Sequence, residues 1–432
     1  MGAVLFSVMG CFAMTALARR LLLIAPHNSY RIAPYIEAAS RLGIEVTIAS
    51  AGAHSLIDVI SNGLHIDFSN QAEAIATLLA AAREKPFHAV LGTDDASVGI
   101  AAELACELGL KHNPPAAAIF TRRKDRARQC LQSAGVPVPG FQRIEFNQSV
   151  TAQLEQLSFP CVLKPLAMSA SRGVIRVNNL DEALAATARI ETILRDVLLA
   201  EEREAILAEA FITGREVAYE GILDSGELKC LAMFDKPEPL NGPYFEETYY
   251  ITPSRLPAPI QQQVHSIVSD ACMAYGLQQG PVHAELRIDE QGNAWVMEVA
   301  ARTIGGECAR LVELATGQPL ENLVLAQLLG LELKPAVFEG GAGVLMIPIP
   351  SAGILRRIEG LSAARSVPGI EELVISVRDG HELVTLPEGS SYLGFIYAVA
   401  DDAAAAEQAL REAHSRLKIV TAPLFKLQAA GV

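Results

Sequence analysis

The sequence predicts a multidomain α/β protein whose first domain is a Rossmann-like parallel sheet. Three observations favour this class. Strand-like apolar runs alternate with helical patterns near the N-terminus, which is typical of parallel sheets with crossover helices. The chain has 432 residues, more than one hydrophobic core usually serves, so two or three units are expected. Half of the residues are hydrophobic and 19% are charged, a composition that excludes a disordered chain.

The N-terminal domain is expected at residues 1–118. Its strand-like runs and helical patterns follow one another at residues 20–25, 33–42, 44–49, 89–92 and 98–108. The first three segments indicate a βαβ opening. No GxGxxG follows the first run, so the sequence lacks the dinucleotide-binding fingerprint.

The first 18 residues are interpreted as an N-terminal extension. They are apolar, and the positive charges of Arg19 and Arg20 follow the stretch, whereas a secretory signal has its charges in front. The stretch is also short for a membrane span. Met14 is an alternative start, and no membrane partner is expected.

Charge and cysteine content narrow the classes of partner. The formal net charge of -14 arises without a compensating block of Lys and Arg, so no nucleic-acid partner is expected. The seven cysteines are scattered and form no CxxC pair, which indicates reduced thiols in a cytoplasmic compartment. Cys308 lies beside the candidate site, where we interpret it as a small buried hydrophobic residue.

A second unit begins near a helix expected over residues 124–134. A glycine closes this helix, and two prolines after it favour an extended chain. We expect this core unit at residues 119–334. A third unit of α+β type is expected at residues 335–432, after a glycine-rich stretch.

A lysine and a loop of small residues suit phosphate binding. The segment 159–165 is predicted to be a buried strand that carries Lys164 near its end. The loop after it contains Ser169, Ser171, Arg172 and Gly173. Small residues let backbone N–H groups approach an anion, and lysine supplies positive charge. An ordinary surface hairpin with a solvated lysine fits these residues equally well.

Residues 206–221 are predicted to form two strand-like pieces around a glycine. Alternation places Glu216, Ala218 and Glu220 on one face. A strand of this kind can meet adenine with backbone groups while a carboxylate accepts ribose hydroxyls. Taken singly, Glu209 and Glu216 are also typical of solvated strand charges.

An antiparallel hairpin is predicted for residues 281–302. With Gln291 and Gly292 as its turn, it pairs His283 with Ala300, Glu285 with Glu298 and Arg287 with Val296. Directly opposed carboxylates destabilise a sheet unless a proton, a cation or solvent compensates them.

A divalent ion resolves this conflict. Mg²⁺ takes a few carboxylate oxygens together with nucleotide phosphates and water, and Glu285 and Glu298 can supply the protein's share. Arg302 follows on the same face and suits the charge that develops in phosphoryl transfer. The alternative, an exposed hairpin with scattered charges, is disfavoured by the apolar neighbours along both strands.

An ordered set of motifs resembles the ATP-grasp superfamily, and within it the L-amino-acid ligase and carnosine synthase-like branch. The motifs are Lys124–Arg128 before Ala134–Pro139, Val162–Pro165, Ser169–Val174, Glu209–Ile212 with Gly214–Glu216, and His283–Arg287 with Glu298–Gly306. Each motif is weakly specific, whereas the ordered set is highly specific. The resemblance covers most of the chain and implies an ATP-grasp fold, with a mobile lid at about 150–208 in the core and a small ligase-type domain at the C-terminus.

The resemblance also implies the roles of the site residues. ATP binding is implied for Lys124, Lys164, Ser169, Ser171, Arg172, Gly173, Glu209, Ala210, Ile212 and Glu216. In this set the serine-rich loop covers the phosphates and Glu216 holds the ribose. Glu285 and Glu298 are implied to bind Mg²⁺, with Mn²⁺ as a substitute. Arg302 would stabilise the acyl-phosphate step, and the Gly305–Gly306 loop would lie beside the substrate carboxylate.

Two positions depart from the pattern of many relatives. Ala300 stands where many have Asn, which leaves the number of Mg²⁺ ions open, and Ala170 stands where they have Gly. Ala at the first position is common in the ligase branch, so we interpret it as a branch marker. Glu247 lies where this branch presents groups to its acceptor and is a candidate for binding an amino group. A solvated acidic loop fits Glu247 equally well.

The resemblance implies an ADP-forming carboxylate–amine ligase. Such an enzyme activates a carboxylate, here expected to be that of an amino acid, as an acyl phosphate and condenses it with an amine. Two alternatives remain: an ATP-grasp carboxylase or purine-pathway enzyme, and a nucleotide-binding regulatory protein without turnover. The expected partners are small carboxylate and amine substrates, and the sequence leaves monomer and homodimer open.

Overall fold

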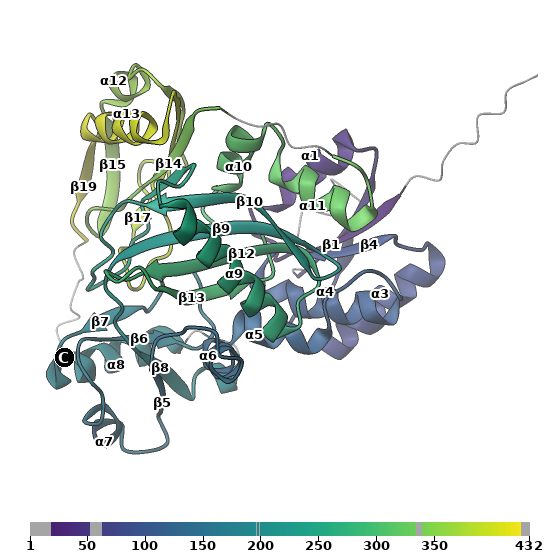
Figure 1. Ribbon diagram of the computed structural model, residues 1–432, viewed down its shortest axis with the longest axis horizontal. Coiled ribbons are helices and arrows are strands. Elements are labelled where there is room, and N and C mark those ends of the chain that lie inside the picture. The colour runs from purple at the N-terminus through teal and green to yellow at the C-terminus, as the bar shows by residue number, and fades with distance from the viewer. Residues whose placement is uncertain (1–18, 52–62, 196, 198, 334–338, 425–432) are drawn as a thin grey trace, which may run out of the picture.

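The computed structural model describes residues 19–51, 63–195, 197, 199–333 and 339–424. The expected N-terminal extension lies outside this part of the chain. Figure 1 shows the N-terminal unit on one side of a large central sheet, with the C-terminal elements and a smaller sheet around the other side. Within the described ranges, no helix is long and apolar enough to cross a lipid bilayer.

The N-terminal unit is a four-stranded parallel sheet in the order β3-β2-β1-β4. Its elements are β1 (Arg20–Ile24), α1 (Ile32–Arg41), β2 (Glu45–Ser50), β3 (Gly63–His65), α3 (Gln71–Glu84), β4 (Ala89–Gly92) and α4 (Asp95–Glu107). Leu21 and Leu23 pack with α1, whereas Leu22 and Ile24 pack with α3 and α4. Because helices cover both faces, the central strand is apolar throughout. The predicted Rossmann-like opening is confirmed.

The central sheet has eight strands in the order β13-β12-β9-β10-β11-β14-β18-β16. They are β9 (Arg215–Asp224), β10 (Glu227–Lys236), β11 (Tyr249–Thr252), β12 (Gln279–Ile288), β13 (Ala294–Ala300), β14 (Gly341–Ile347), β16 (Ile370–Ile375) and β18 (Gly394–Ala400). Neighbouring strands are antiparallel. Strands β14, β16 and β18 come from the expected C-terminal unit. That unit and the core therefore share one sheet.

The two faces of the central sheet differ in chemistry. Helix α9 (Ala258–Tyr275) lies across one face in Figure 1, over a core that includes Val217, Tyr219, Val282, Ala284 and Leu286. Side chains alternate along a strand, so the residues between these point to the opposite face. They are Glu216, Ala218, Glu220, His283, Glu285 and Arg287. Helices α10 (Ala309–Thr316) and α11 (Leu320–Leu329) cover part of that face.

The hairpin of β12 and β13 places Glu285 opposite Glu298, as predicted. The predicted pairing of Arg287 with Val296 is wrong. A bulge just beyond the Glu285–Glu298 pair shifts the register by one residue, so that Arg287 faces Trp295. The bulge keeps Glu285 opposite Glu298, whereas the residues nearer the turn pair in a register shifted by one residue.

The turn itself also differs from the prediction of a two-residue Gln291–Gly292 turn. The strands end at Ile288 and begin again at Ala294, so the connection has the five residues Asp289–Asn293. The Asp289 carboxylate accepts hydrogen bonds from the backbone N–H groups of Gln291 and Asn293 and from the indole of Trp295. These side-chain bonds stabilise the longer loop.

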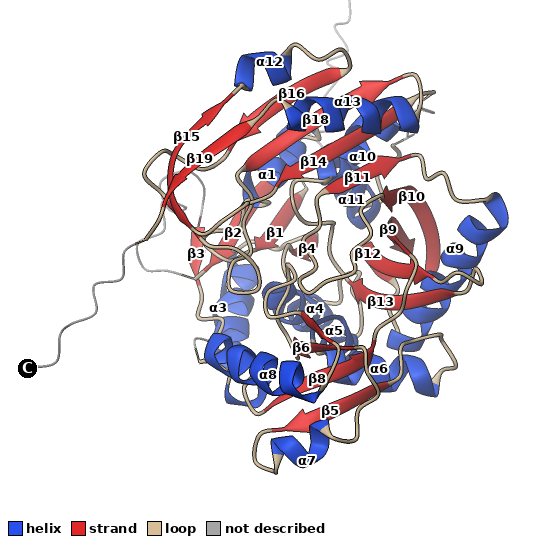
Figure 2. Cartoon of the chain, turned by 90° about the vertical axis from the view of Figure 1, so that its left-hand side faces the viewer, coloured by secondary structure: helices blue, strands red, loops and turns tan. Residues whose placement is uncertain are grey.

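A separate sheet in the order β5-β8-β6-β7 contains the expected lid. We call residues 141–210 the lid unit; it lies at the bottom of Figure 2. Its elements are β5 (Phe141–Glu145), α7 (Val150–Leu154), β6 (Cys161–Pro165), β7 (Ile175–Val177), α8 (Leu180–Leu194), η2 (Ala200–Glu202) and β8 (Ala205–Ala210). The unit has its own core, built around Ile144, Leu163 and Ile190. The expectation that this unit is a mobile lid stays a prediction.

The remaining elements join or cap these units. Residues 115–133 connect the N-terminal and lid units through η1 (Pro115–Ala117), α5 (Ala118–Arg122) and α6 (Lys124–Ser133). The C-terminal section adds a small sheet in the order β17-β15-β19. Its elements are β15 (Gly353–Glu359), α12 (Leu361–Arg365), β17 (Glu382–Leu383), α13 (Ala403–Ser415) and β19 (Lys418–Ala422).

The loop between β17 and β18 contacts the lid unit. Glu388 forms an ion pair with Arg189 of α8, with Nε 2.5 Å from Oε1. Its backbone oxygen accepts a hydrogen bond from Arg172 Nε at 3.0 Å. The backbone N–H of Gly173 donates to the oxygen of Pro387 at 2.9 Å. The C-terminal section thus holds the loop that was predicted to cover phosphates.

Replacing Glu388 by Gln is expected to loosen this loop without unfolding the protein. Both side chains of the Arg189–Glu388 pair are 40% exposed, and exposed pairs contribute about 0.2–1 kcal/mol. Hydrogen exchange over residues 169–176 should therefore rise about two- to fivefold, with a change in melting temperature below about 2 °C. The exposed Glu382 provides a matched control, whose Gln variant should exchange like the wild type. Equal exchange in all three proteins would contradict the expectation.

Candidate active site

A cavity of about 840 Å³ lies where the central sheet meets the lid unit and loops of the N- and C-terminal sections. Most of the predicted site residues line it, namely Lys124, Lys164, Ser169, Ser171, Glu209, Ala210, Ile212, Glu216, Glu247, Glu285, Glu298, Arg302, Gly305 and Gly306. Arg172 and Gly173 instead contact the C-terminal loop. The structure therefore brings together motifs that span 183 positions of sequence, from 124 to 306.

Cationic groups lie where the lid unit meets the cavity. The ammonium of Lys164 is 2.6 Å from Glu209, and Arg128 Nε is 2.7 Å from the same carboxylate. Lys124 Nζ lies 3.4 Å from Glu298. Burial lowers the pKa of Lys164 to about 8, although Glu209 favours the charged form. Lys164 therefore loses its proton closer to neutral pH than an exposed lysine does.

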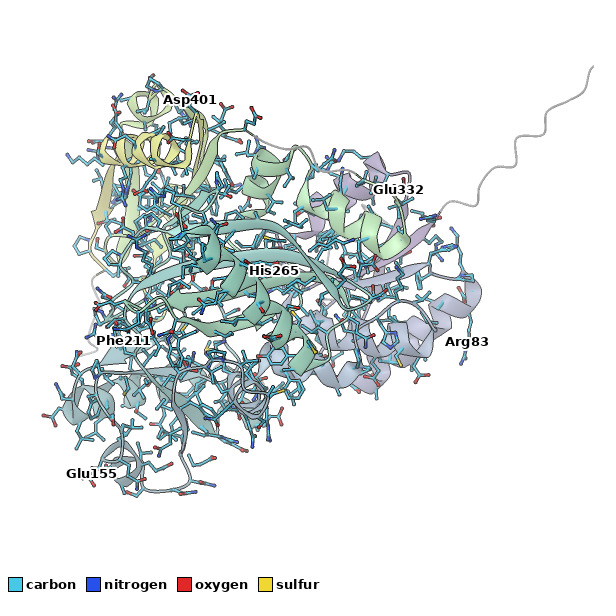
Figure 3. All side chains as sticks on the ribbon, viewed as in Figure 1. Arg83, Glu155, Phe211, His265, Glu332 and Asp401 are labelled. Carbon is cyan, nitrogen blue, oxygen red and sulfur yellow. The ribbon has the colours of Figure 1, made fainter. Side chains whose placement is uncertain are left out.

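The segment after β8 offers apolar surface and backbone groups. Ala210, Phe211 and Ile212 line the cavity. Phe211, labelled in Figure 3, lies where the lid unit meets the central sheet, with the guanidinium groups of Arg176 and Arg287 4.2 and 5.1 Å from its ring centroid. The backbone oxygen of Ile212 accepts a hydrogen bond from Arg287 at 2.6 Å. Such a slot suits a flat heteroaromatic ring.

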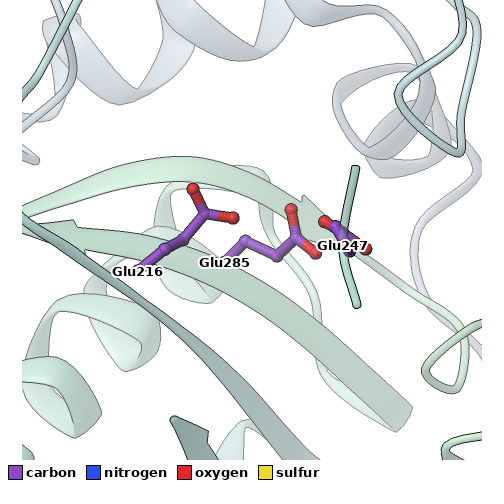
Figure 4. Close-up of side chains that lie close together, drawn as sticks. All are labelled: Glu216, Glu247 and Glu285. Atoms are coloured by element: carbon purple, nitrogen blue, oxygen red, sulfur yellow. The ribbon is translucent and has the colours of Figure 1, made fainter. Parts of the chain in front are cut away.

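One buried lysine holds three of the site carboxylates together. Figure 4 shows Glu216, Glu247 and Glu285 turned toward one another, and the ammonium of Lys236 lies 2.9, 2.7 and 2.9 Å from them. Burial opposes the charge of Lys236, but the three carboxylates outweigh it and raise its pKa well above the ordinary value. This fixed cation offsets the repulsion within the cluster. Lys236 is not among the predicted site residues, because its strand carries no motif.

Glu247 has an unusual protonation equilibrium within this cluster. Burial and the neighbouring Glu285 raise its pKa to about 7, against the attraction of Lys236. Its second oxygen accepts a hydrogen bond from Tyr250 at 2.7 Å. Glu247 is therefore anchored inside the site, which disfavours the interpretation as a solvated loop residue.

The opposed pair Glu285 and Glu298 suits a hard divalent cation. The two side chains are 19% and 28% exposed, and both line the cavity. Burial opposes ionisation of Glu298, but Lys124 and Arg302 outweigh it and lower its pKa to about 2. Glu298 is thus a carboxylate at neutral pH. Oxygen ligands of this kind fit Mg²⁺, whereas Ala300 provides no side-chain ligand.

The N-terminal unit holds the loop that follows β13. Arg302 donates from Nε and Nη2 to the carboxylate of Asp95 at 2.8 and 3.2 Å. Arg31 donates to Asp94 at 2.8 Å and to the backbone oxygen of Ile304 at 3.2 Å. These paired donors fix the direction of Arg302. The sequence analysis did not assign the N-terminal residues to the site; the two adjacent aspartates after a buried strand were the available signal.

The fold and the site together define an ATP-grasp protein. Family models agree over three parts of the chain. The ATP-grasp N-terminal domain matches residues 36–112, the ATP-grasp domain matches residues 157–310 and the L-amino acid ligase C-terminal domain 2 matches residues 345–422. The chain therefore belongs to the ATP-grasp superfamily, whose domains bind ATP.

Within this superfamily, the chain resembles amino-acid ligases. A solved L-amino acid ligase from Bacillus licheniformis is 28% identical, with a TM-score of 0.77 over 94% of this chain and 99% of that one. The alanine–anticapsin ligase of Bacillus subtilis is 26% identical over 51% of this chain and 50% of its own length, so the chain spans about half of that relative. The D-alanine–D-alanine ligase of Bordetella avium is 25% identical over 59% of this chain and 80% of its own length.

Replacing Lys236 by Met is expected to destabilise the fold at pH 7 by about 3–5 kcal/mol, because one buried and two half-buried carboxylates lose their buried cation. Their pKa values in the folded state then rise above the unfolded value, so the folded state binds protons more tightly. The free energy of unfolding should therefore recover as the pH falls toward about 5.

Urea unfolding at several pH values measures this change. Lys229, exposed on the same strand, supplies the control, since its Met variant should unfold like the wild type at every pH. Equal stability of the Lys236→Met variant and the wild type at pH 7 would show that the cluster does not need the ammonium.

Proposed function

We propose that this protein is an ADP-forming ligase that uses ATP to join a carboxylate, in particular that of an amino acid, to an amine. The observation that carries the proposal is the gathering of two lysines, an opposed carboxylate pair and a buried arginine around one cavity. The names of the relatives support it, because the L-amino acid, alanine–anticapsin and D-alanine–D-alanine enzymes are all ligases.

ATP enters with its adenine against Ala210 and Ile212, where backbone groups supply a donor and an acceptor beside an apolar wall. The carboxylate of Glu216 accepts the ribose hydroxyls. The phosphates lie near Lys124 and Lys164, whose ammonium groups offset their charge. Ser169 and Ser171 cover them from the lid unit, with Arg172 and Gly173 anchoring that loop, and Glu209 keeps Lys164 in place.

Glu285 and Glu298 would hold Mg²⁺, with Mn²⁺ as a substitute. When bound there, the ion would offset negative charge on the phosphates of ATP. Lys236 and His283 keep the Glu285 carboxylate in position, at 2.9 and 3.5 Å. The pair therefore presents its remaining oxygens to the cavity.

In the first step, an oxygen of the substrate carboxylate attacks the γ-phosphorus of ATP. The bond between this phosphorus and the β–γ bridging oxygen breaks, and its electron pair leaves with ADP. Arg302, held by Asp95, stabilises the negative charge of the transferring group. Gly305 and Gly306 leave room for the substrate carboxylate beside this arginine.

In the second step, the amine nitrogen attacks the carbonyl carbon of the acyl phosphate. The bond from this carbon to the bridging oxygen breaks, phosphate leaves with the electron pair, and the nitrogen passes a proton to the departing phosphate. Glu247 binds a substrate amino group. The lid unit excludes water from the acyl phosphate, which would otherwise hydrolyse.

Phosphate release from Mg-ATP, measured across a matrix of amino acids offered singly and in pairs, tests the proposal. Release should require a pair and should fall by about 10²–10³ in a Glu298→Ala variant, which loses a charged ligand of the transition state. Glu290, exposed in the same hairpin, provides the control variant. Equal inactivity of wild type and Glu298→Ala, with ATP still bound, would favour a regulatory protein, and release that depends on bicarbonate would favour a carboxylase.

The affinity for ATP is expected to fall as the pH rises through about 8, because Lys164 then loses the proton that attracts phosphate. Between pH 7 and one unit above the pKa, Kd should rise about tenfold. A Lys164→Met variant should bind more weakly at pH 7 and show little change over the same range. Calorimetric titration with a nonhydrolysable ATP analogue measures both, and a flat wild-type profile would contradict the role of Lys164.

A further inference from the structure

Glu220 is a buried carboxylate that does not reach the cavity. It lies on β9, directly opposite His283 of β12, and its exposed fraction is 0%. Its Oε2 lies 3.2 Å from His283 Nδ1, and its Oε1 accepts a hydrogen bond from the backbone N–H of Ile304 at 3.2 Å. The two oxygens of the Glu220 carboxylate therefore contact two different parts of the chain, strand β12 and the loop after β13.

Both contacts lead to the proposed catalytic groups. His283 stands two residues before Glu285 on the same face, and its Nε2 lies 3.5 Å from Glu285 Oε1. Ile304 stands two residues after Arg302 and directly before Gly305. Glu220 is thus linked to the proposed metal pair through His283, and it contacts the loop that carries Arg302 directly.

A carboxylate at this position is costly for the fold. Glu220 lies on the same strand face as Ala218 and Ile222, which belong to an apolar core, and burial raises its pKa. An apolar residue would satisfy the packing without this cost. Neither contact caps the end of a helix or strand, and neither stabilises a turn next to β9. The contacts instead connect β12 to the loop after β13, which an apolar side chain at this position could not do.

We propose that Glu220 is a positioning residue of the ligase reaction, which fixes the distance between the Glu285–Glu298 pair and the loop that carries Arg302. This inference rests on the proposed function. Through His283 it limits the orientations of the Glu285 carboxylate, and through Ile304 it holds the loop that Arg31 and Asp95 also contact. Arg302 and the Glu285–Glu298 pair then keep one fixed arrangement around the transferring phosphoryl group.

Two substitutions of Glu220 test its contacts with His283 and Ile304. Gln at position 220 keeps an oxygen for Ile304 but offers N–H groups to His283, which reverses that hydrogen bond. Ala removes both contacts. For Glu220→Gln we expect kcat to fall about ten- to hundredfold, as for other groups that orient ligands, with KM for ATP within about twofold. For Glu220→Ala we expect a similar or larger loss, together with faster hydrogen exchange over residues 301–307.

Asp224→Asn supplies the matched control, because Asp224 lies on the same strand and contacts Lys111 and Gln327 away from the cavity. Its kcat and exchange should equal those of the wild type. A Glu220→Gln variant with unchanged kcat, or with a loss that matches its unfolded fraction, would overturn the proposal. So would a Glu220→Ala variant whose residues 301–307 exchange at the wild-type rate.

Hydrogen exchange needs no turnover, so it decides the structural part even if no substrate pair is found. Failure of the proposed function would appear in the wild type, which would form no amide with any pair. Failure of the present inference would appear only in the Glu220 variants, with the wild type active.

Discussion

Charge balance on the inner face of the central sheet is the constraint on which the rest of the structure depends. Alternation along β9, β12 and β13 points several glutamates to this face, and two like charges 4 Å apart repel by about 4 kcal/mol at the effective dielectric constant of a protein surface. The partners that balance them come from other elements. Lys236 comes from β10, and Lys124 comes from the helix before the lid unit. The site is therefore assembled from several elements of the folded chain.

Sequence patterns predicted the features that depend on residues close together in the chain. The period of two along the strands and the ordered motifs identified the Glu285–Glu298 pair and a set of residues that line the cavity, and the alternation of strand and helix identified the N-terminal sheet. The predicted two-residue turn at Gln291–Gly292 was wrong, because the carboxylate of Asp289 stabilises a longer loop. A bulge then restored the carboxylate pair, so two local deviations left the site unchanged.

Contacts over long sequence distances could not be predicted in this way. Arg302 and Asp95 are 207 positions apart, and Arg31 and Ile304 are 273 apart, with no periodicity that connects them. Lys236 lacks a surrounding motif for the same reason: its role depends on three strands that meet only in the folded sheet. The residues that such reasoning misses are those that hold the predicted groups in place, and these depend on the arrangement of whole units.

The shared central sheet has a consequence for how such a chain can change in evolution. Strand β11 pairs with β14 over Tyr249–Thr252 and Ala342–Leu345, so the C-terminal section supplies the hydrogen-bonding neighbour of a core strand. Without it, β11 would present an unpaired edge, which promotes association with other chains. A recombination event that exchanged the C-terminal section for that of another protein would have to reproduce this strand register as well as the loop against the lid unit. The section and the core therefore constrain each other as parts of one sheet, even though the sequence divides there.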